Sequence, residues 1–158
     1  MICNNESLTE NDKVMQVRAA IEHRATWLYY LVDEAWKRGL DYQFAYDAVY
    51  RCGCLHGQAK HDNGNLREFA ENVFRNDGVM VFEQVLDIRE DEVIVDFHYE
   101  PLVAAWQKLT DDEELIRTLF DIAMAGDFGI FSNSKYKFEV LKRITEGDRV
   151  GKIRITYA

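Results

Sequence analysis

The spacing of apolar residues changes about halfway along the chain, and this change constrains the fold more than any other feature. Up to about residue 76, apolar side chains recur every three or four positions, as in Val14, Val17 and Ile21, which indicates amphipathic helices. After residue 77, several segments alternate apolar and polar residues, which is typical of strands. Helices and strands gathered in separate parts of a chain favour an α+β fold.

The start and end of the first helix carry recognisable signals. Ser7 followed by Glu10 forms a capping-box pattern, although Thr9 or Asn11 can also start the helix. Gly39 is suited to the position just after the last helical turn, where a left-handed backbone is common. The sequence therefore predicts a long first helix that ends before Gly39.

A second helix is predicted from Asp41, a good N-cap, to about residue 61, and a third over about 66–75. Gly53 and Gly57 lie four residues apart in the second helix and leave one of its surfaces bare. Glycine costs about 1 kcal/mol against alanine inside a helix. We therefore expect this surface to pack closely against another helix.

For the second half of the chain, the sequence predicts two strands, then two helices and then two more strands. The expected elements are strands over 79–88 and 93–99, helices over 102–109 and 111–124, and strands over 136–144 and 150–157. They are separated by turns at 76–78, 89–91 and 145–148, by Pro101 and by a loop at 126–129. The order ααα-ββ-αα-ββ predicts a single domain over 1–158, made of a helical part (1–76) and a ββααββ part (77–158). Its sheet is expected to be four-stranded and mostly antiparallel, with the helices on one face.

The charge balance excludes several classes of partner. The chain has 28 acidic and 19 basic side chains, a net charge of −9, and no cluster of Lys and Arg. Nucleic acids and anionic membranes both attract such clusters, so we expect neither as a partner. No apolar run reaches the roughly 18 residues of a transmembrane helix. The N-terminal sequence MICNNESLTEND has neither the basic nor the apolar region of a secretory signal.

The cysteines and the absence of known motifs limit the expected location, cofactors and partners. The three cysteines, Cys3, Cys52 and Cys54, form no disulfide framework, which favours reduced thiols and a cytoplasmic location. No phosphate-binding glycine loop, dinucleotide fingerprint or serine-hydrolase elbow is present, so no cofactor is expected. A homodimer is expected only because it is the commonest oligomer. A small molecule is the remaining class of partner.

The most informative segment for chemistry is 96–101. Alternation along one strand places Asp96, His98 and Glu100 on the same face, and two carboxylates beside an imidazole can perform acid–base work. The alternative is a solvated sheet face, where Lys152 and Arg154 of the last strand form cross-strand ion pairs with these acids. Glu100 differs from the others because it lies at the strand end, where functional groups concentrate.

Two further groups are candidates. Cys52 and His56 share one helical face and can hold a metal with ligands from elsewhere, and Cys54 is a weaker third candidate or a nucleophile. The alternative is that these cysteines are small buried apolar residues. Asp127, between Gly126 and Gly129, can approach a ligand closely or cap its own turn, and Asp121 is grouped with it as a candidate.

Three blocks of the second half resemble the L-2-amino-thiazoline-4-carboxylic acid hydrolase family. They are Phe97-His98-Tyr99-Glu100-Pro101-Leu102, the segment 119–128 with Asp127, and Glu146-Gly147 followed by Ile153-Arg154-Ile155. The resemblance covers residues 96–158 best, and the helical half fits through its helix pattern. Members of the family open a cyclic isothiourea ring with water, so the resemblance implies a small-molecule hydrolase.

The chain departs from the family pattern at the family's cysteines. The family usually has Cys where this chain has Glu100, and another Cys where this chain offers Phe120 or Ala123. It usually has His-Cys where this chain has Val150-Gly151. If those thiols act as nucleophiles or metal ligands, this chain has lost that chemistry.

The residues and the resemblance together predict hydrolysis assisted by a carboxylate. Glu100 would bind a cationic amidine or act as general base on water, and His98 or Asp127 would protonate the leaving atom. The candidate substrate-binding residues are Arg154, which would hold a carboxylate bidentately, Asp121 and Tyr99. Two alternatives stay open: a ligand-binding protein that has lost catalysis, and a metal-binding role for Cys52, Cys54 and His56.

Overall fold

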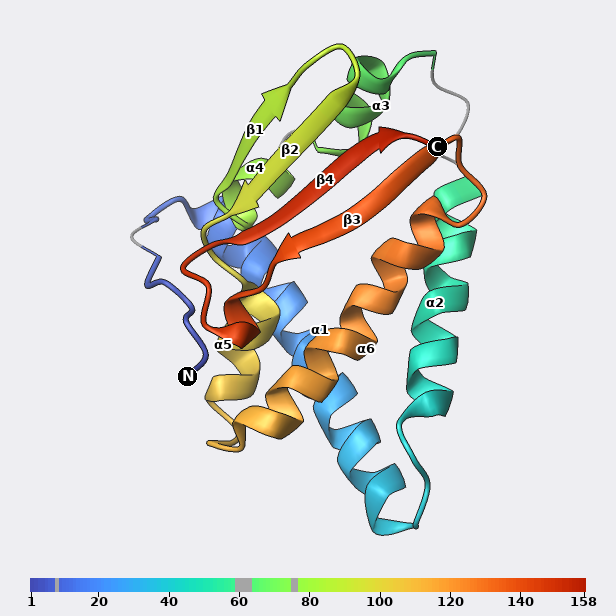
Figure 1. Cartoon of the computed structure of the whole chain (residues 1–158). Coiled ribbons are helices and arrows are strands. Elements are labelled where there is room, and N and C mark those ends of the chain that lie inside the picture. The colour runs from blue at the N-terminus through green and yellow to red at the C-terminus, as the bar shows by residue number, and fades with distance from the viewer. Residues whose placement is uncertain (8, 59–63, 75–76) are drawn as a thin grey trace.

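The computed structural model describes residues 1–158 except residue 8, residues 59–63 and residues 75–76 (Figure 1). The helices are α1 (Asp12–Lys37), α2 (Gln43–Gln58), α3 (Leu66–Val73), α4 (Asp77–Val81), α5 (Pro101–Gln107) and α6 (Glu113–Phe131). The strands are β1 (Gln84–Ile88), β2 (Glu92–Phe97), β3 (Tyr136–Lys142) and β4 (Gly151–Tyr157), with a 3₁₀ turn η1 (Ile144–Glu146). Among the described residues, no helix combines the length and apolar character needed to cross a bilayer.

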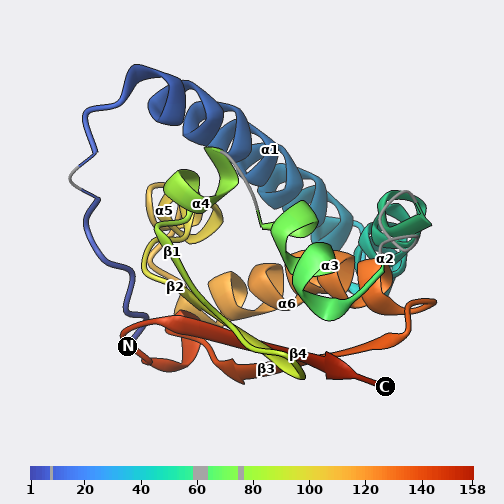
Figure 2. The same cartoon turned by 90° about the horizontal axis from the view of Figure 1, so that it is seen from above.

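The four strands form one antiparallel sheet in the order β1-β2-β4-β3. In its centre, Val95 of β2 lies opposite Leu86 of β1 on one side and Ile153 of β4 on the other. The labelled helices gather on one side of this sheet (Figure 2). These observations confirm the predicted α+β class and the four-stranded antiparallel sheet. The observed order contains one more helix than predicted, because α4 precedes β1.

Residues 77–83 differ from the sequence prediction, which placed a turn at 76–78 and a strand from residue 79. The chain forms α4 there, and β1 begins only at Gln84. Arg18 of α1 supports this short helix, because its Nε donates to Val81 O at 2.8 Å and its Nη2 to Met80 O at 3.2 Å. A buried guanidinium from a distant helix therefore satisfies the carbonyls that local alternation assigned to a strand.

The first helix ends before Gly39, as predicted. It begins after Asn11, one of the alternative starts, so the start predicted from the capping box of Ser7 and Glu10 is wrong. Asn11 is the N-cap, and its side chain accepts from the N–H groups of Lys13 and Val14 at 3.1 Å. Gly39 follows the helix with a φ of +76°, in the left-handed region. The predicted ends of the next two helices, near residues 61 and 75, fall outside the described residues; α2 is described to Gln58 and α3 ends at Val73.

Helices α2 and α6 approach so closely that backbone meets backbone. A Cβ at Gly53 would lie 2.0 Å from the carbonyl oxygen of Gly126, and one at Gly129 would lie 2.2 Å from that of Tyr50. The predicted close packing at Gly53 is therefore confirmed. The predicted loop at 126–129 is wrong, since α6 continues to Phe131. Its glycines serve as a helix-packing surface rather than as turn residues.

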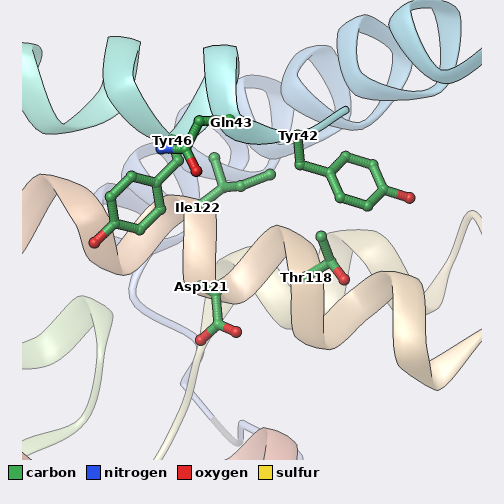
Figure 3. A pocket seen from close by; sticks show the side chains of 6 residues that line it. All are labelled: Tyr42, Gln43, Tyr46, Thr118, Asp121 and Ile122. Atoms are coloured by element: carbon green, nitrogen blue, oxygen red, sulfur yellow. The ribbon is translucent and has the colours of Figure 1, made fainter. Parts of the chain in front are cut away.

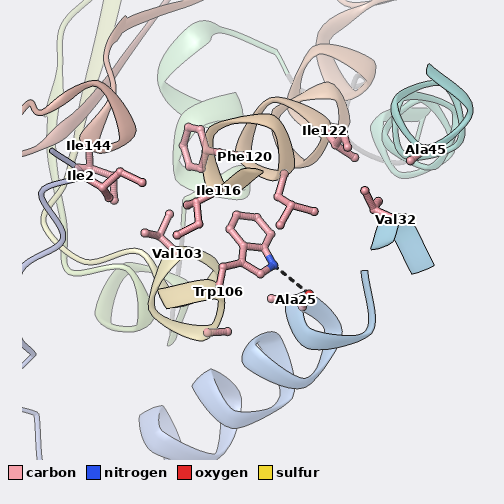
Figure 4. Packing of buried hydrophobic residues seen from close by; sticks show 12 residues of the cluster. Ile2, Ala25, Val32, Ala45, Val103, Trp106, Ile116, Phe120, Ile122 and Ile144 are labelled. Atoms are coloured by element: carbon pink, nitrogen blue, oxygen red, sulfur yellow. Dashed lines mark hydrogen bonds between the residues drawn. The ribbon is translucent and has the colours of Figure 1, made fainter. Parts of the chain in front are cut away.

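The buried apolar residues form two separate clusters. The helical cluster lies among α1, α2, α5 and α6, and its centre is Trp106, whose indole N–H donates to Ala25 O at 2.9 Å (Figure 4). The sheet cluster joins the inner face of the sheet to α3 and the end of α6, and it contains Phe69, Phe131 and Ile155. Each cluster contributes to the walls of the cavity described below.

A short segment before α1, residues 2–5, ties distant elements together, and we call it the N-terminal strap. Cys3 N donates to Ile144 O at 2.9 Å. Asn4 hydrogen-bonds both backbone groups of Glu100, at 3.1 Å each. Asn5 Nδ2 donates to His98 O at 2.8 Å and to Arg149 O at 3.0 Å. The strap therefore fixes the stretch of chain between β2 and α5.

Candidate functional site

A cavity of about 610 Å³ is lined by residues of both hydrophobic clusters. Its walls come from the inner face of the sheet and from α1, α2 and α6, and most of the lining side chains are apolar. This volume falls within the range of about 300–1,000 Å³ of pockets that hold drug-sized ligands. A few polar groups interrupt the apolar wall, which is the usual composition of a ligand site.

Residues that line the cavity and are also exposed mark its opening. Trp27 and Leu31 of α1 are 64% and 46% exposed, and both line the cavity. Cys52 and His56 of α2 also line it and are exposed. These residues give one part of the rim, on α1 and α2, an aromatic ring, an aliphatic side chain, a thiol and an imidazole. Other exposed residues that line the cavity are Arg24, Gly78 and Lys142.

Glu100 brings its carboxyl group to the cavity from the junction of β2 and α5. It is the N-cap of α5, where its Oε1 accepts from Leu102 N–H at 3.2 Å, and Pro101 occupies the first helical position. Burial among the apolar groups of the wall raises the pKa of Glu100 to about 8, although the Leu102 N–H opposes this rise. The carboxyl group therefore holds a proton at neutral pH.

Two charges from other elements act on Glu100. The negative charge of Asp127 on α6 raises the pKa of Glu100 further, whereas the positive charge of Arg24 on α1 lowers it. All three side chains line the cavity. The structure thus brings Glu100 and Asp127 to the same cavity, and it places Asp127 on a helix rather than in the predicted loop.

A substitution of Asn4 tests whether the N-terminal strap holds Glu100 in position. Replacing Asn4 with alanine removes two hydrogen bonds to the Glu100 backbone, so we expect a stability loss of about 1–2 kcal/mol in urea unfolding. For a reaction that uses Glu100, turnover should also fall about tenfold, because the carboxyl group is no longer held in place. Asn5→Ala is the matched control: it removes two hydrogen bonds of the same strap without touching Glu100. Equal turnover losses in both variants would contradict the role given to Asn4.

The prediction that Asp96, His98 and Glu100 share one strand face is wrong. Strand β2 ends at Phe97, and the chain then leaves the sheet, since Glu100 must turn to cap α5 ahead of Pro101. Asp96 forms a cross-strand ion pair with Lys152, at 2.9 Å. The alternative of a cross-strand ion pair is confirmed for Asp96, but its Oδ1 is buried rather than solvated. The structure does not place His98 among the residues that line the cavity.

Arg154 lies on the opposite side of the sheet from the cavity. Its neighbour Ile153 lines the cavity, and alternation along β4 turns Arg154 to the other face. There its Nη2 contacts Glu139 Oε2 at 2.6 Å, and its Nη1 lies 3.9 Å from Glu92. The structure therefore does not bring Arg154 to Glu100.

The other two predicted substrate contacts also lie elsewhere. The ring of Tyr99 packs under the guanidinium of Arg18, 4.1 Å from ring centre to carbon. Asp121 forms an ion pair with Arg143 and borders a shallow hollow of about 160 Å³ between α2 and α6 (Figure 3). Tyr42 and Tyr46 border the same hollow, which is open and separate from the large cavity.

The cysteine–histidine group is divided by the geometry of α2. Cys52 and His56 face the cavity, whereas Cys54 Sγ lies 3.4 Å from the Oγ of Ser132, the residue that caps the end of α6. Within the described part of the chain, no group of three or more His, Cys, Asp or Glu side chains could hold a metal ion.

Sequence reasoning missed several polar residues of the cavity, among them Arg24, Gln84 and Lys142. Arg24 lies on the same helical face as Ile21 and Leu28. A charged residue on this otherwise apolar face was the sequence signal that could have identified Arg24 as a cavity residue. Gln84 lines the cavity from the start of β1, and among the described residues no donor reaches its buried Oε1. No local signal pointed to Gln84, because the prediction placed it within a longer strand.

Comparisons with known proteins identify the family. The family model of L-2-amino-thiazoline-4-carboxylic acid hydrolase matches residues 18–154. No curated protein matches the chain. Among solved structures, the chain is similar to trafficking protein particle complex subunit 3 from Naegleria fowleri, covalently bound to palmitic acid. That alignment has 16% identity and a TM-score of 0.41, and it covers 94% of this chain and 84% of the other. The family match spans most of the sequence and both halves of the fold, and the chain therefore belongs to the L-2-amino-thiazoline-4-carboxylic acid hydrolase family.

Proposed function

We propose that this protein hydrolyses a C–N or C–S bond of a cyclic amidine-like small molecule in the cavity that holds Glu100 and Asp127. The observation that carries the proposal is the meeting of two carboxyl groups in one cavity, where Glu100 keeps its proton at neutral pH and the negative charge of Asp127 acts on it. Such a pair supplies a general acid and a general base side by side. Family membership supports the hydrolytic class of the reaction.

In the proposed reaction, Asp127 accepts a proton from water while the water oxygen bonds to the amidine carbon. The C–S or C–N bond of the ring then breaks, and its electron pair leaves on sulfur or nitrogen. Glu100 donates its proton to that leaving atom, and the proton held by Asp127 restores Glu100 afterwards. Water is added across one bond. The raised pKa thus favours general-acid chemistry for Glu100 rather than the general-base role that the sequence suggested.

Arg24 is the basic side chain that we assign to a carboxylate on the substrate. It lines the cavity and lies near enough to Glu100 to lower its pKa. It takes the place that the sequence suggested for Arg154, whose guanidinium is engaged by Glu139 on the other side of the sheet. A guanidinium binds a carboxylate through two parallel hydrogen bonds, which would also orient the ring.

The pH dependence of turnover tests the proposal. With 2-aminothiazoline-4-carboxylate or another cyclic amidine as substrate and mass spectrometry of the product, kcat/KM should fall as the pH rises through about 8, because Glu100 then loses its proton. Arg24→Gln removes the charge that lowers this pKa, so the falling limb should move to higher pH. A limb that belonged to the substrate's own amidine would not move.

Arg38→Gln is the matched control for this shift. Arg38 pairs with Glu34 on the exposed end of α1 and should leave the limb where it is in the wild type. A rate that rises through the same pH range would instead make Glu100 the general base. Failure to detect any turnover of cyclic amidines would contradict the proposed reaction.

Ligand binding without turnover is the second candidate. It is favoured by one observation: Glu100 stands where the family usually carries a cysteine. Under this candidate, wild type would bind a cyclic amidine without consuming it. Glu100→Gln would then change the dissociation constant alone.

A further inference from the structure

The cavity is much larger and more apolar than a single small polar ring requires. Beyond the carboxyl groups, it is bounded by aromatic and aliphatic side chains of the sheet and of α6, among them Phe97, Phe138, Phe120 and Ile153. Phe120 belongs to the helical cluster, whereas Phe97, Phe138 and Ile153 belong to the sheet cluster or pack against it. Water beside such walls gains few hydrogen bonds, so an apolar group is the chemically matched occupant.

Apolar side chains make up most of the lining. Besides Glu100, Asp127 and Arg24, the polar side chains of the lining are Gln84, Lys142, Lys152, Cys52 and His56. The charges that act on Glu100 come from Asp127 and Arg24. Lys152, which also lines the cavity, pairs with Asp96 through its ammonium group at 2.9 Å. A ligand that fills the whole space therefore needs one polar head and one apolar body, since a polar body would lose its water without replacement.

We propose that the ligand of this cavity is an amphipathic amidine, with a cationic head at Glu100 and Asp127 and a hydrocarbon body between the two clusters. This inference rests on the proposed function for the head group and names the class of substrate that the reaction takes. The exposed Trp27 and Leu31 at the opening suit the same ligand, because its apolar part meets apolar side chains as it enters.

A series of n-alkylguanidinium ions from methyl to octyl tests the apolar body. These ions carry the cationic head and cannot undergo ring opening, and binding can be followed by calorimetry and by the fluorescence of Trp27 at the opening. The dissociation constant should fall about fourfold per added methylene, the factor that corresponds to about 0.8 kcal/mol. The alkanesulfonate of the same length should bind more weakly, because its head is an anion.

Two variants that fill the apolar part of the cavity test whether the hydrocarbon part of the ligand binds there. Ala123→Phe on α6 and Val140→Phe on β3 both add a ring to the apolar wall, from different elements, and neither residue belongs to the proposed catalytic group. Each should abolish the dependence on chain length while it keeps the binding of methylguanidinium and the turnover of a small cyclic amidine. Two independent positions protect the test against a variant that does not fold.

The outcomes separate this inference from the proposed function. A dissociation constant that does not change with chain length would overturn the apolar body and leave the small-ring hydrolase intact. A chain-length dependence that survives both filling variants would also overturn it, because the chain would then bind outside the cavity. Equal binding of alkylguanidinium and alkanesulfonate would overturn the cationic head. If the wild-type protein does not turn over small cyclic amidines, that result contradicts the proposed function, whereas the alkylguanidinium series still decides on the apolar body.

Discussion

Replacing Glu100 with glutamine should lower kcat/KM by about 10²- to 10⁴-fold, the usual contribution of a general acid, and should raise stability at neutral pH. The glutamine side chain keeps a carbonyl oxygen that can accept from Leu102 N–H, so the cap of α5 survives. It lacks the dissociable proton that the leaving atom requires. A variant that is both inactive and more stable separates a chemical loss from misfolding.

The gain in stability follows from the two pKa values of Glu100. The folded protein holds the proton with a pKa of about 8, whereas the ordinary value is 4.5. Between these values the unfolded chain has lost a proton that the folded chain keeps. The contribution of Glu100 to stability is therefore complete below the lower value and is lost as the pH rises through the higher one. Urea unfolding at several pH values should show this decline in wild type and a flatter profile in Glu100→Gln.

Glu113→Gln is the matched control, the same substitution at the start of α6. The carboxylate of Glu113 accepts from Ile2 N–H at 3.1 Å, and that hydrogen bond lowers its pKa. A lowered pKa contributes stability above the ordinary value that is lost as the pH falls, so this variant should lose stability at neutral pH and keep its turnover. Wild-type turnover in Glu100→Gln would remove Glu100 from the mechanism.

Replacing Gly53 with alanine should destabilise the protein by about 3 kcal/mol, the upper part of the usual range for overpacked cores. The added Cβ would lie 2.0 Å from the carbonyl oxygen of Gly126, and a backbone atom cannot rotate away as a side chain can. Helices α2 and α6 must therefore separate. Asp127 follows Gly126 directly, so turnover should fall as well. The urea midpoint and kcat/KM of the variant measure the two effects.

Two other glycines provide the controls. A Cβ at Gly126 would meet the Cγ1 methyl of Val49 at 3.4 Å and its carbonyl oxygen at 3.9 Å, and a Cβ at Gly78 would meet no atom of the described residues within 4 Å. Gly126→Ala should therefore change stability by less than about 1 kcal/mol. Gly78→Ala should be neutral or up to about 1 kcal/mol more stable, since alanine favours helix. If Gly53→Ala were as mild as Gly126→Ala, the two helices would be further apart in solution than the structure places them.

Local signals predicted most of the fold because they act through neighbouring residues. The cap at Asn11, the left-handed Gly39 and the alternation in β2 each depend on a few adjacent side chains. The errors arose where a distant contact decides the outcome. Arg18 reaches α4 from α1, and the glycines of 126–129 pack against α2, so neither effect is visible in a local window.

The same distinction between local signals and distant contacts applies to the candidate site. Glu100 and Asp127 could be singled out from the sequence, because a carboxylate at a strand end and another between glycines are unusual positions. Their meeting depends on the turn that takes the chain out of β2 and into α5. The same turn removes His98 from the site. Arg154 was excluded by strand alternation combined with the strand order, and the sequence does not determine that order.

The division of the apolar core into two clusters around one cavity links folding to metabolite concentration. A small molecule that contacts both clusters binds only the folded chain, so mass action stabilises that chain by about 2.7 kcal/mol when its concentration is a hundred times the dissociation constant. Such a gain is a sizeable part of the stability of a typical domain. The amount of intact protein in a cell would then depend on the supply of its own ligand.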